Sequence, residues 1–283
     1  MPEISPRNML LCVFSFNMGK ALANCLDSIG RHCAGFDVVL ADDQSDDPET
    51  VWTIERYRSI FAHVHPSTKA KTGQRHGNLY SNIQEMCGYA RSRGYRYLFM
   101  IQDDMQFVRP LDAAVCREYG GIFDFDRVLQ VDPRFLRPRS GAVEIRRDMH
   151  AYSFLPGDDR RSYADVGILD LEVLRRLDWH FLPSERENKV ALSRLGYLRV
   201  FPFTPVFMHV PFPEKYSKGR KRVRFFPYRR GMYSYHDMSA DEISAMDGRD
   251  IGSVPYYKDF LKPKNLGLAR IFYDCRKDRR IFG

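Results

Sequence analysis

Two adjacent carboxylates, Asp103 and Asp104, directly follow Gln102 at the end of the apolar stretch 95–101 (YRYLFMI). Neighbouring carboxylates repel each other unless a cation or hydrogen-bond donors offset their charge. Oxygen ligands of this kind suit Mg²⁺ or Mn²⁺, which can also bridge to substrate phosphates. The pair therefore predicts a divalent-cation site, although the dipeptide alone is more often a solvated loop or a helix N-cap.

Two further acidic clusters have different surroundings. Residues 42–47 (DDQSDD) also follow an apolar stretch, but they lack the glycine and terminal glutamate of an EF-hand calcium loop. A helix-capping turn before Thr50 is the alternative, with Asp46 or Asp47 as the cap. Residues 124–126 (DFD) precede an apolar stretch instead of following one, which predicts a surface turn.

Apolar runs that alternate with amphipathic segments predict the elements that position these carboxylates. Strands and helices alternating in this way form right-handed βαβ units with a mostly parallel sheet, which binds ligands at the carboxyl ends of its strands. Both Asp pairs and Asn17 lie at such ends, so they form one candidate site. Buried strands are expected at 9–14, 36–40, 61–64 and 95–101, and helices at 18–29 (capped by Asn17 and stopped at Gly30), 49–58 and 79–90.

The second half of the chain has a less regular pattern. We expect a polar loop with short strands over 134–161 and no linker before Pro213. The remaining expected strands are 128–131, 198–201 and 206–210, and the expected helices are 170–177, 185–195 and 240–246.

Positive charge is concentrated in one segment. The chain has 44 Lys and Arg against 36 Asp and Glu, and its composition is that of an ordinary globular protein. Residues 215–230 contain eight of the basic residues and no acidic one, so the remaining residues are neutral overall. This distribution predicts a local anionic partner and no nucleic-acid partner. With no CxxC pair, no signal peptide and no apolar run of 18 residues, we expect a reduced, cytoplasmic protein.

The order of the motifs resembles that of the GT-A glycosyltransferases, especially the large family-two inverting group, over roughly residues 8–213. The matching segments are 14–17 (FSFN), 26–29 (LDSI), 39–47 (VLADDQSDD), 99–105 (FMIQDDM, in place of the DxD metal motif), 165–168 (DVGI), Glu185 eleven residues before Gly196, and 206–210 (VFMHV).

This resemblance implies an α/β fold of GT-A (Rossmann-like) type, with a mostly parallel central sheet flanked by helices. The glycosyltransferase domain would span 1–213, with a nucleotide-sugar half at about 1–110 and an acceptor half at about 111–213. Residues 214–283 would form a basic C-terminal extension.

The resemblance also implies roles for individual residues on the donor side. Asp104 would ligate a divalent cation, Mn²⁺ or Mg²⁺, on the donor diphosphate, with His209 as a further metal or phosphate ligand. Gln102 departs from the family because it stands where the first Asp of DxD is expected, and His209 alone would more often be a core histidine. The nucleotide-binding residues implied are Phe14, Asn17, Asp42, Asp43, Gly73, Arg75 and Asp103.

Glu185 is the candidate general base, with Glu187 as the substitute. An inverting transfer needs one carboxylate to accept the proton of the acceptor hydroxyl while the anomeric carbon is attacked from the opposite face. The alternative is that Ser184 caps a helix here and the acidic residues only favour its dipole.

The implied function is transfer of a sugar from a nucleotide diphosphate to a saccharide or lipid-linked saccharide, in surface polysaccharide or glycoconjugate biosynthesis at the inner face of the membrane. A sugar-phosphate nucleotidyltransferase is an alternative, but residues 14–19 (FSFNMG) lack the Gly-rich loop and basic residue of that class. A second alternative is a non-catalytic module that binds RNA or anionic lipid through 215–230. In the enzyme, that segment would contact phosphate near His209 and membrane around Phe225, unless it is only a solvated tail.

Overall fold

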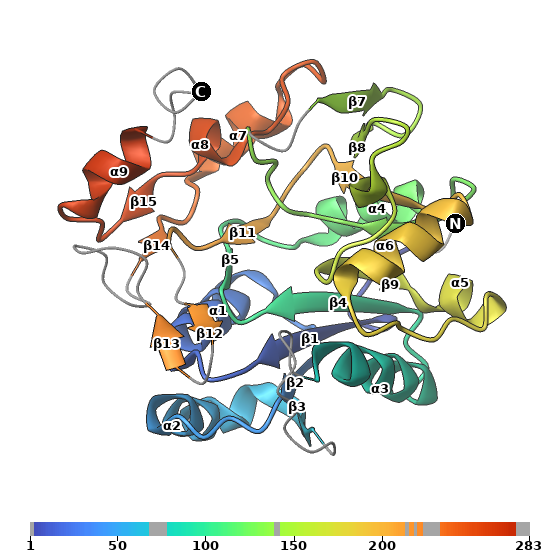
Figure 1. The fold of residues 1–283 in the computed structure, drawn as a ribbon. Helices are drawn as coiled ribbons and strands as arrows, with labels where there is room; N and C mark the ends of the chain where they lie inside the picture. The colour runs from blue at the N-terminus through green and yellow to red at the C-terminus, as the bar shows by residue number, and fades with distance from the viewer. Residues whose placement is uncertain are drawn as a thin grey trace.

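The computed structural model describes residues 3–67, 78–138, 142–212, 215–217, 220–222 and 233–275. A nine-stranded sheet in the order β3-β2-β1-β4-β9-β6-β10-β8-β7 forms its centre, with helices against both faces (Figure 1).

The first half of the sheet is a parallel block in the order β3-β2-β1-β4. Every residue of β1 is buried, because helices cover both of its faces. This block confirms the strands and helices expected from the sequence. Its elements are β1 (Met9–Ser15), α1 (Gly19–His32), β2 (Val38–Asp42), α2 (Pro48–Arg56), the 3₁₀ helix Arg58–Ile60, β3 (Phe61–Pro66), α3 (Leu79–Ser92) and β4 (Tyr97–Gln102).

Both expected ends of the first helix are wrong. Helix α1 continues through Gly30 to His32, because the helix packing on the sheet outweighs the small propensity cost of one glycine. Its N-cap position is taken by Met18, without a side-chain cap, and Asn17 contacts another loop instead.

The second half of the sheet is mixed. Strand β9 lies antiparallel between β4 and β6, while β10 is parallel to β6 and antiparallel to β8. Helix α4 and strand β9 are elements that the sequence pattern missed. The elements are α4 (Ala113–Ile122), β6 (Val128–Val131), β7 (Val143–Arg146), β8 (Ala151–Phe154), the 3₁₀ helix Asp159–Arg161, β9 (Gly167–Asp170), α5 (Leu171–Arg176), α6 (Glu185–Arg194) and β10 (Leu198–Pro202).

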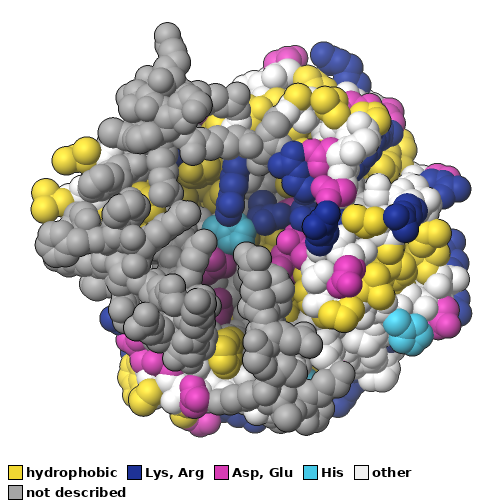
Figure 2. Space-filling view, in the orientation of Figure 1, with side chains coloured by type: hydrophobic (Ala, Val, Ile, Leu, Met, Phe, Trp, Pro, Cys, Tyr) yellow, Lys and Arg dark blue, Asp and Glu magenta, His cyan; other side chains and the backbone are white. Residues whose placement is uncertain are grey.

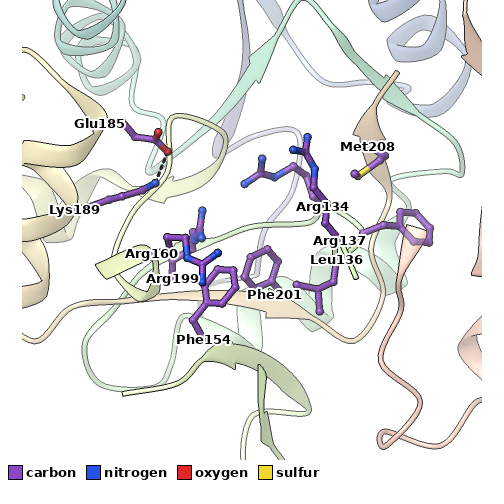
Figure 3. Close-up of a pocket in the computed structure, with 11 residues that line it drawn as sticks. Arg134, Leu136, Arg137, Phe154, Arg160, Glu185, Lys189, Arg199, Phe201 and Met208 are labelled. Atoms are coloured by element: carbon purple, nitrogen blue, oxygen red, sulfur yellow. Dashed lines mark ion pairs between the residues drawn. The ribbon is translucent and has the colours of Figure 1, made fainter. Parts of the chain in front are cut away.

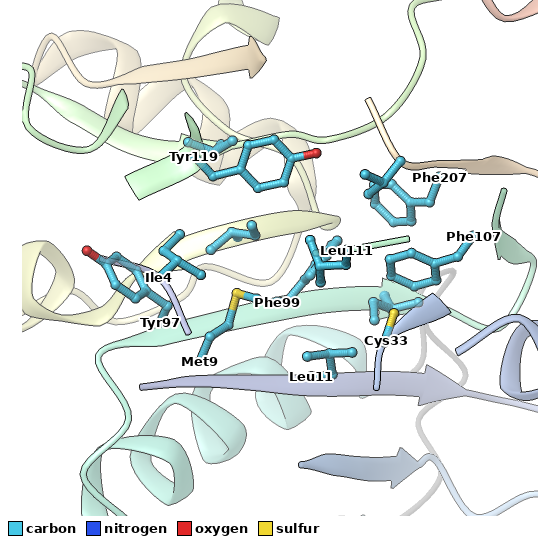
Figure 4. Packing of buried hydrophobic residues seen from close by; sticks show 14 of the residues in the cluster. Ile4, Met9, Leu11, Cys33, Tyr97, Phe99, Phe107, Leu111, Tyr119 and Phe207 are labelled. Atoms are coloured by element: carbon cyan, nitrogen blue, oxygen red, sulfur yellow. The ribbon is translucent and has the colours of Figure 1, made fainter. Parts of the chain in front are cut away.

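A small pair of strands, β5 (Met105–Phe107) and β11 (Phe207–His209), lies over one face of the sheet. The rings of Phe99, Phe107 and Phe207 pack together there, with centroids 5.0 to 5.7 Å apart (Figure 4). Because the register places His209 opposite Met105, this aromatic contact fixes the end of β11 beside the turn that follows β4.

The described part of the C-terminal segment packs on the sheet domain. Tyr235, Met238 and Met246 share a buried cluster with Val108 and Met208, and the described helices are too short and polar to span a bilayer. The boundary at residue 213 between a glycosyltransferase domain and a C-terminal extension stays a prediction. The elements are β12 (Lys215–Ser217), β13 (Arg220–Arg222), β14 (Ser234–Tyr235), α7 (Ala240–Asp247), α8 (Tyr257–Phe260), β15 (Pro263–Lys264) and α9 (Ala269–Cys275).

Candidate functional site

Asp103 and Asp104 form the turn between β4 and β5, at the carboxyl end of the parallel block. The backbone N–H of Asp103 donates to the carbonyl of Phe14 at 3.1 Å, and the N–H of Phe16 donates to Asp103 Oδ2 at 3.1 Å. Burial, followed by the charge of Asp104, raises the pKa of the Asp103 carboxyl well above its usual value.

Asp104 has the opposite tendency because cations and an imidazole surround it. Its Oδ1 lies 3.1 Å from Nδ1 of His209, and Nη1 of Arg134 lies 3.0 Å from Nε2 of the same ring. Burial alone would raise the pKa of Asp104. The contact with His209 and the charges of Arg137 and Arg134 outweigh burial, so the pKa lies below its usual value. The pKa values of the two adjacent carboxyls are thus shifted in opposite directions.

The contacts of His209 fix its tautomer. An arginine can only donate, so Nε2 accepts from Arg134 and Nδ1–H donates to Asp104. Burial lowers the pKa of His209, and Arg134 and Arg137 lower it further against the pull of Asp104. A neutral imidazole between a carboxylate and a guanidinium results.

The loop after β2 is held by its own polar side chains. Asp42 accepts from the N–H of Ser45 at 2.8 Å and from its hydroxyl at 2.6 Å. Asp43 accepts from the backbone and side-chain nitrogens of Asn78 at 3.0 and 2.9 Å, which ties β2 to the start of α3. Asp47 accepts from Thr50 and caps α2, as one of the sequence alternatives expected.

Asn17 shapes this loop from the β1 side. It is 1% exposed and adopts a left-handed φ of 55°, which asparagine tolerates. Its side-chain oxygen accepts from the N–H groups of Asp46 and Asp47, and its Nδ2 donates to Asp46 at 2.8 Å. The side chain of Phe14 is buried in the core. For both residues the contacts give a positioning role, and direct nucleotide binding stays a prediction; Gly73 and Arg75 lie outside the described residues.

The two candidate bases on α6 lie in different environments. Ser184 caps the helix and donates to Glu187 Oε2 at 2.7 Å, so the exposed Glu187 serves the cap. Glu185 forms an ion pair with Lys189 at 2.7 Å and lines a cavity of about 220 Å³ (Figure 3). The geometry therefore favours Glu185 of the two.

Arginines line the same cavity, and sequence reasoning missed them. The lining comprises Arg134, Phe135, Leu136, Arg137, Phe154, Arg160, Glu185, Lys189, Arg199, Phe201 and Met208. Figure 2 shows Lys and Arg side chains gathered beside Asp and Glu side chains and a His on this face. Asp165, in the segment before β9, has its pKa raised to about 6 by burial and by the charge of Glu185, which places its charge close to the candidate base.

The candidate metal ligands fit a divalent cation only in part. Within the described ranges, no group of three or more His, Cys, Asp or Glu side chains converges on one point. Asp104 offers oxygen donors that suit Mn²⁺ or Mg²⁺ when substrate phosphates complete the coordination. Both ring nitrogens of His209 are already engaged, Nδ1–H with Asp104 and Nε2 with Arg134, so His209 could ligate a cation only after giving up one of these contacts.

Comparison with known proteins identifies the fold. No protein-family model and no curated protein matches the chain. The solved structure of S. aureus TarS, a glycosyltransferase of GT-A type, matches with a TM-score of 0.50 at 15% identity, over 72% of this chain and 37% of that one. The chain has the GT-A glycosyltransferase fold.

Structures of TarS residues 1–349 are also similar to the chain. The complex with UDP-GlcNAc matches at 16% identity and a TM-score of 0.47, over 69% of this chain and 55% of the other. The complex with UDP matches at 16% identity and a TM-score of 0.48, over 69% of this chain and 57% of the other. The chain thus spans little more than half of these fragments.

Proposed function

We propose that this protein transfers a sugar from a nucleotide diphosphate to an acceptor hydroxyl. One observation carries the proposal: Arg134 contacts His209, the partner of Asp104, and lines the same cavity as Glu185. Arg134 therefore connects the acidic site proposed for a diphosphate-bound cation with the cavity that holds the candidate base. This is the arrangement that displacement at an anomeric carbon requires.

The donor side of the proposal rests on the ends of β1, β2 and β4. Asp104 would ligate a divalent cation, with His209 as a further ligand once a ring nitrogen is released from its present contacts, and the charge of the cation would offset that of the leaving diphosphate. Asp43 and Asp103 would face the nucleoside. The likeness in fold to TarS, which has been crystallised with UDP-GlcNAc and with UDP, supports a nucleotide sugar as donor.

On the acceptor side, Glu185 would accept the proton of the attacking hydroxyl, giving inversion at the anomeric carbon. Lys189 holds the carboxylate through the ion pair at 2.7 Å. The acceptor we propose is a saccharide, free or lipid-linked, in surface polysaccharide assembly. The membrane contact belongs to residues 215–230, whose side chains lie outside the described residues.

Nucleotide binding tests the proposal. UDP, GDP and other nucleoside diphosphates are screened by thermal shift with and without Mn²⁺, since a ligand at 100 times its Kd stabilises the folded state by about 2.7 kcal/mol. For the nucleotide that binds, Asp104→Asn should weaken Mn²⁺-dependent binding by at least about ten-fold in calorimetry, because the amide loses the charge that attracts the cation. Asp126→Asn, in an exposed turn, is the matched control.

Unchanged nucleotide affinity in Asp104→Asn would refute the metal assignment. Failure of every nucleoside diphosphate to bind the wild-type protein would refute the proposed function itself.

A further inference from the structure

Five cationic side chains line the cavity beside Glu185, and their charges are balanced to different degrees. Lys189 is paired with Glu185, and Arg160 with Asp158. The described residues provide Arg137 with no carboxylate within ion-pair distance, although its charge acts on Asp104. The two remaining cations are Arg134 and Arg199.

Arg134 and Arg199 share a single carboxylate. Asp132 is fully buried and accepts from Nε and Nη2 of Arg134 at 2.8 and 2.6 Å. Nη1 of Arg199 lies 3.5 Å from Asp132 Oδ2, at the limit of a hydrogen bond. Because Arg134 takes both oxygens at short distance, the positive charge of Arg199 is only partly compensated.

Arg199 is buried and held in place by aromatic rings. Its side chain is 4% exposed, with the guanidinium 5.3 Å from the ring centre of Phe154 and 5.0 Å from that of Phe201. No described residue accepts a hydrogen bond from its Nε. Burial lowers the pKa of Arg199 to about 10 against the opposing charge of Asp132. A buried cation that shares its carboxylate and has an unused donor would be stabilised by a further anion.

Arg160 approaches the same aromatic ring from the 3₁₀ helix Asp159–Arg161. Its guanidinium lies 4.5 Å from the ring centre of Phe154, and its Nε and Nη2 face Asp158. Its Nη1 has no acceptor among the described residues, and the side chain is 41% exposed. A guanidinium placed over an aromatic ring can still donate to an oxyanion from the N–H groups along its edge.

We propose that Arg160 and Arg199 bind an oxyanion, a phosphate or a carboxylate, carried by the acceptor next to the hydroxyl that Glu185 deprotonates. This inference rests on the proposed function and specifies its substrate class as an acidic acceptor. A neutral sugar would leave the buried charge of Arg199 balanced only by the carboxylate that it shares with Arg134, whereas an oxyanion would add a second counter-charge.

The donor diphosphate belongs to a different part of the cavity. Arg134 and Arg137 act on Asp104 and His209, whereas Arg160 and Arg199 lie with Phe154, away from Met208 (Figure 3). The aromatic rings are also covered by the guanidinium groups, so they position the arginines and offer little free surface to a sugar ring.

Titration of the nucleotide-saturated protein with anions tests the proposal. The wild-type protein is saturated with UDP, or the nucleotide that binds best, and titrated with inorganic phosphate and separately with glucuronate, against NaCl at equal ionic strength. Calorimetry should detect one of the two anions, and the better binder distinguishes a phosphorylated acceptor from a uronic one. Arg160→Gln should weaken that binding by about ten-fold, the loss of one charge-assisted hydrogen bond.

Two further variants keep the test falsifiable. Arg199→Lys retains the buried charge but not the planar edge, and should also weaken the anion without changing nucleotide affinity. Arg175→Gln, on the exposed surface of α5, is the control and should change neither anion affinity nor nucleotide affinity.

Binding of the anions only in the absence of nucleotide would assign the arginines to the donor diphosphate and overturn the inference. Anion affinity unaffected by Arg160→Gln would also overturn it. Nucleotide binding is measured in the same series, so failure of the proposed function is seen separately.

Discussion

The two sides of the candidate site are built in different ways. On the donor side, the carboxylates of Asp42, Asp43 and Asp103 accept hydrogen bonds from backbone N–H groups of nearby loops. On the cavity side, Arg134 and Arg199 come from different segments and depend on one shared, buried carboxylate, that of Asp132. Loop geometry at the ends of parallel strands therefore creates the first side, and tertiary packing of the mixed half creates the second.

This difference predicts that substitutions on the two sides affect ligand binding and folding stability to different degrees. Charges on the donor side are offset locally, so changing them should affect ligands more than folding. Charges on the cavity side are buried and compensate one another. Changing one of them should therefore affect both ligand binding and folding stability.

Glu185→Gln should give the largest effect, a loss of transfer of roughly 10²–10⁴-fold with donor affinity unchanged. The amide keeps the shape of the side chain but cannot accept the acceptor proton. Steady-state kinetics with the nucleotide sugar identified by binding measures the loss. Glu187→Gln is the matched control on the same helix turn, since its carboxylate serves the Ser184 cap. An inactive Glu187→Gln beside an active Glu185→Gln would reverse the assignment.

The placement of Asp103 and Asp104 at a strand end could be predicted from the sequence because its signals are local. A buried apolar strand followed at once by Asp103 and Asp104 places both carboxylates at the carboxyl end of β4, and parallel topology brings β1 and β2 alongside. The pattern could not show that Asn17 holds the loop instead of capping α1. That role depends on a left-handed backbone and on contacts to residues about 30 positions away.

The cavity could not be predicted because no local pattern marks its arginines. Arg134, Arg160 and Arg199 stand in unrelated segments and meet only because β10 pairs with both β6 and β8. Strand β9 also escaped detection, since an antiparallel strand of four residues between parallel neighbours has little periodicity. A strand-end His was the one signal that joined the two sides, and β11 does place His209 against Asp104.

Asp132→Asn should test the stability half of the contrast. Asp132 is fully buried between Arg134 and Arg199, and removing its charge leaves two guanidinium groups without a counter-ion. We expect a loss of about 3 kcal/mol in the free energy of unfolding, measured by urea denaturation. Asp126→Asn, with a side chain 96% exposed, should change it by less than about 0.5 kcal/mol. Equal stability of the two variants would contradict the importance of the shared carboxylate.

The smallest effect is expected at Asp165, where the two charge environments meet. Its pKa is raised to about 6 by burial and by Glu185, while Arg134 and Lys189 act in the opposite direction. In the unfolded chain an aspartate has a pKa near ~3.9. The folded state therefore binds the proton more tightly, and the stability from this group is complete below about pH 4 and is lost as pH rises through about 6.

Asp165→Asn removes this dependence because an amide does not ionise. The variant should gain about 1–2 kcal/mol relative to wild type between pH 4.5 and 7.5, less than the full shift implies because part of the loss in the wild type has already occurred at pH 4.5. Thermal melts of both proteins at the two pH values measure the difference, and Asp126→Asn again serves as the control. A stability difference between variant and wild type that is the same at both pH values would show that Asp165 is already ionised in the folded protein. Asp165 and Glu185 would then both be negatively charged in the folded protein. Their repulsion would have to be offset by the positive charge of Lys189 or of a bound substrate.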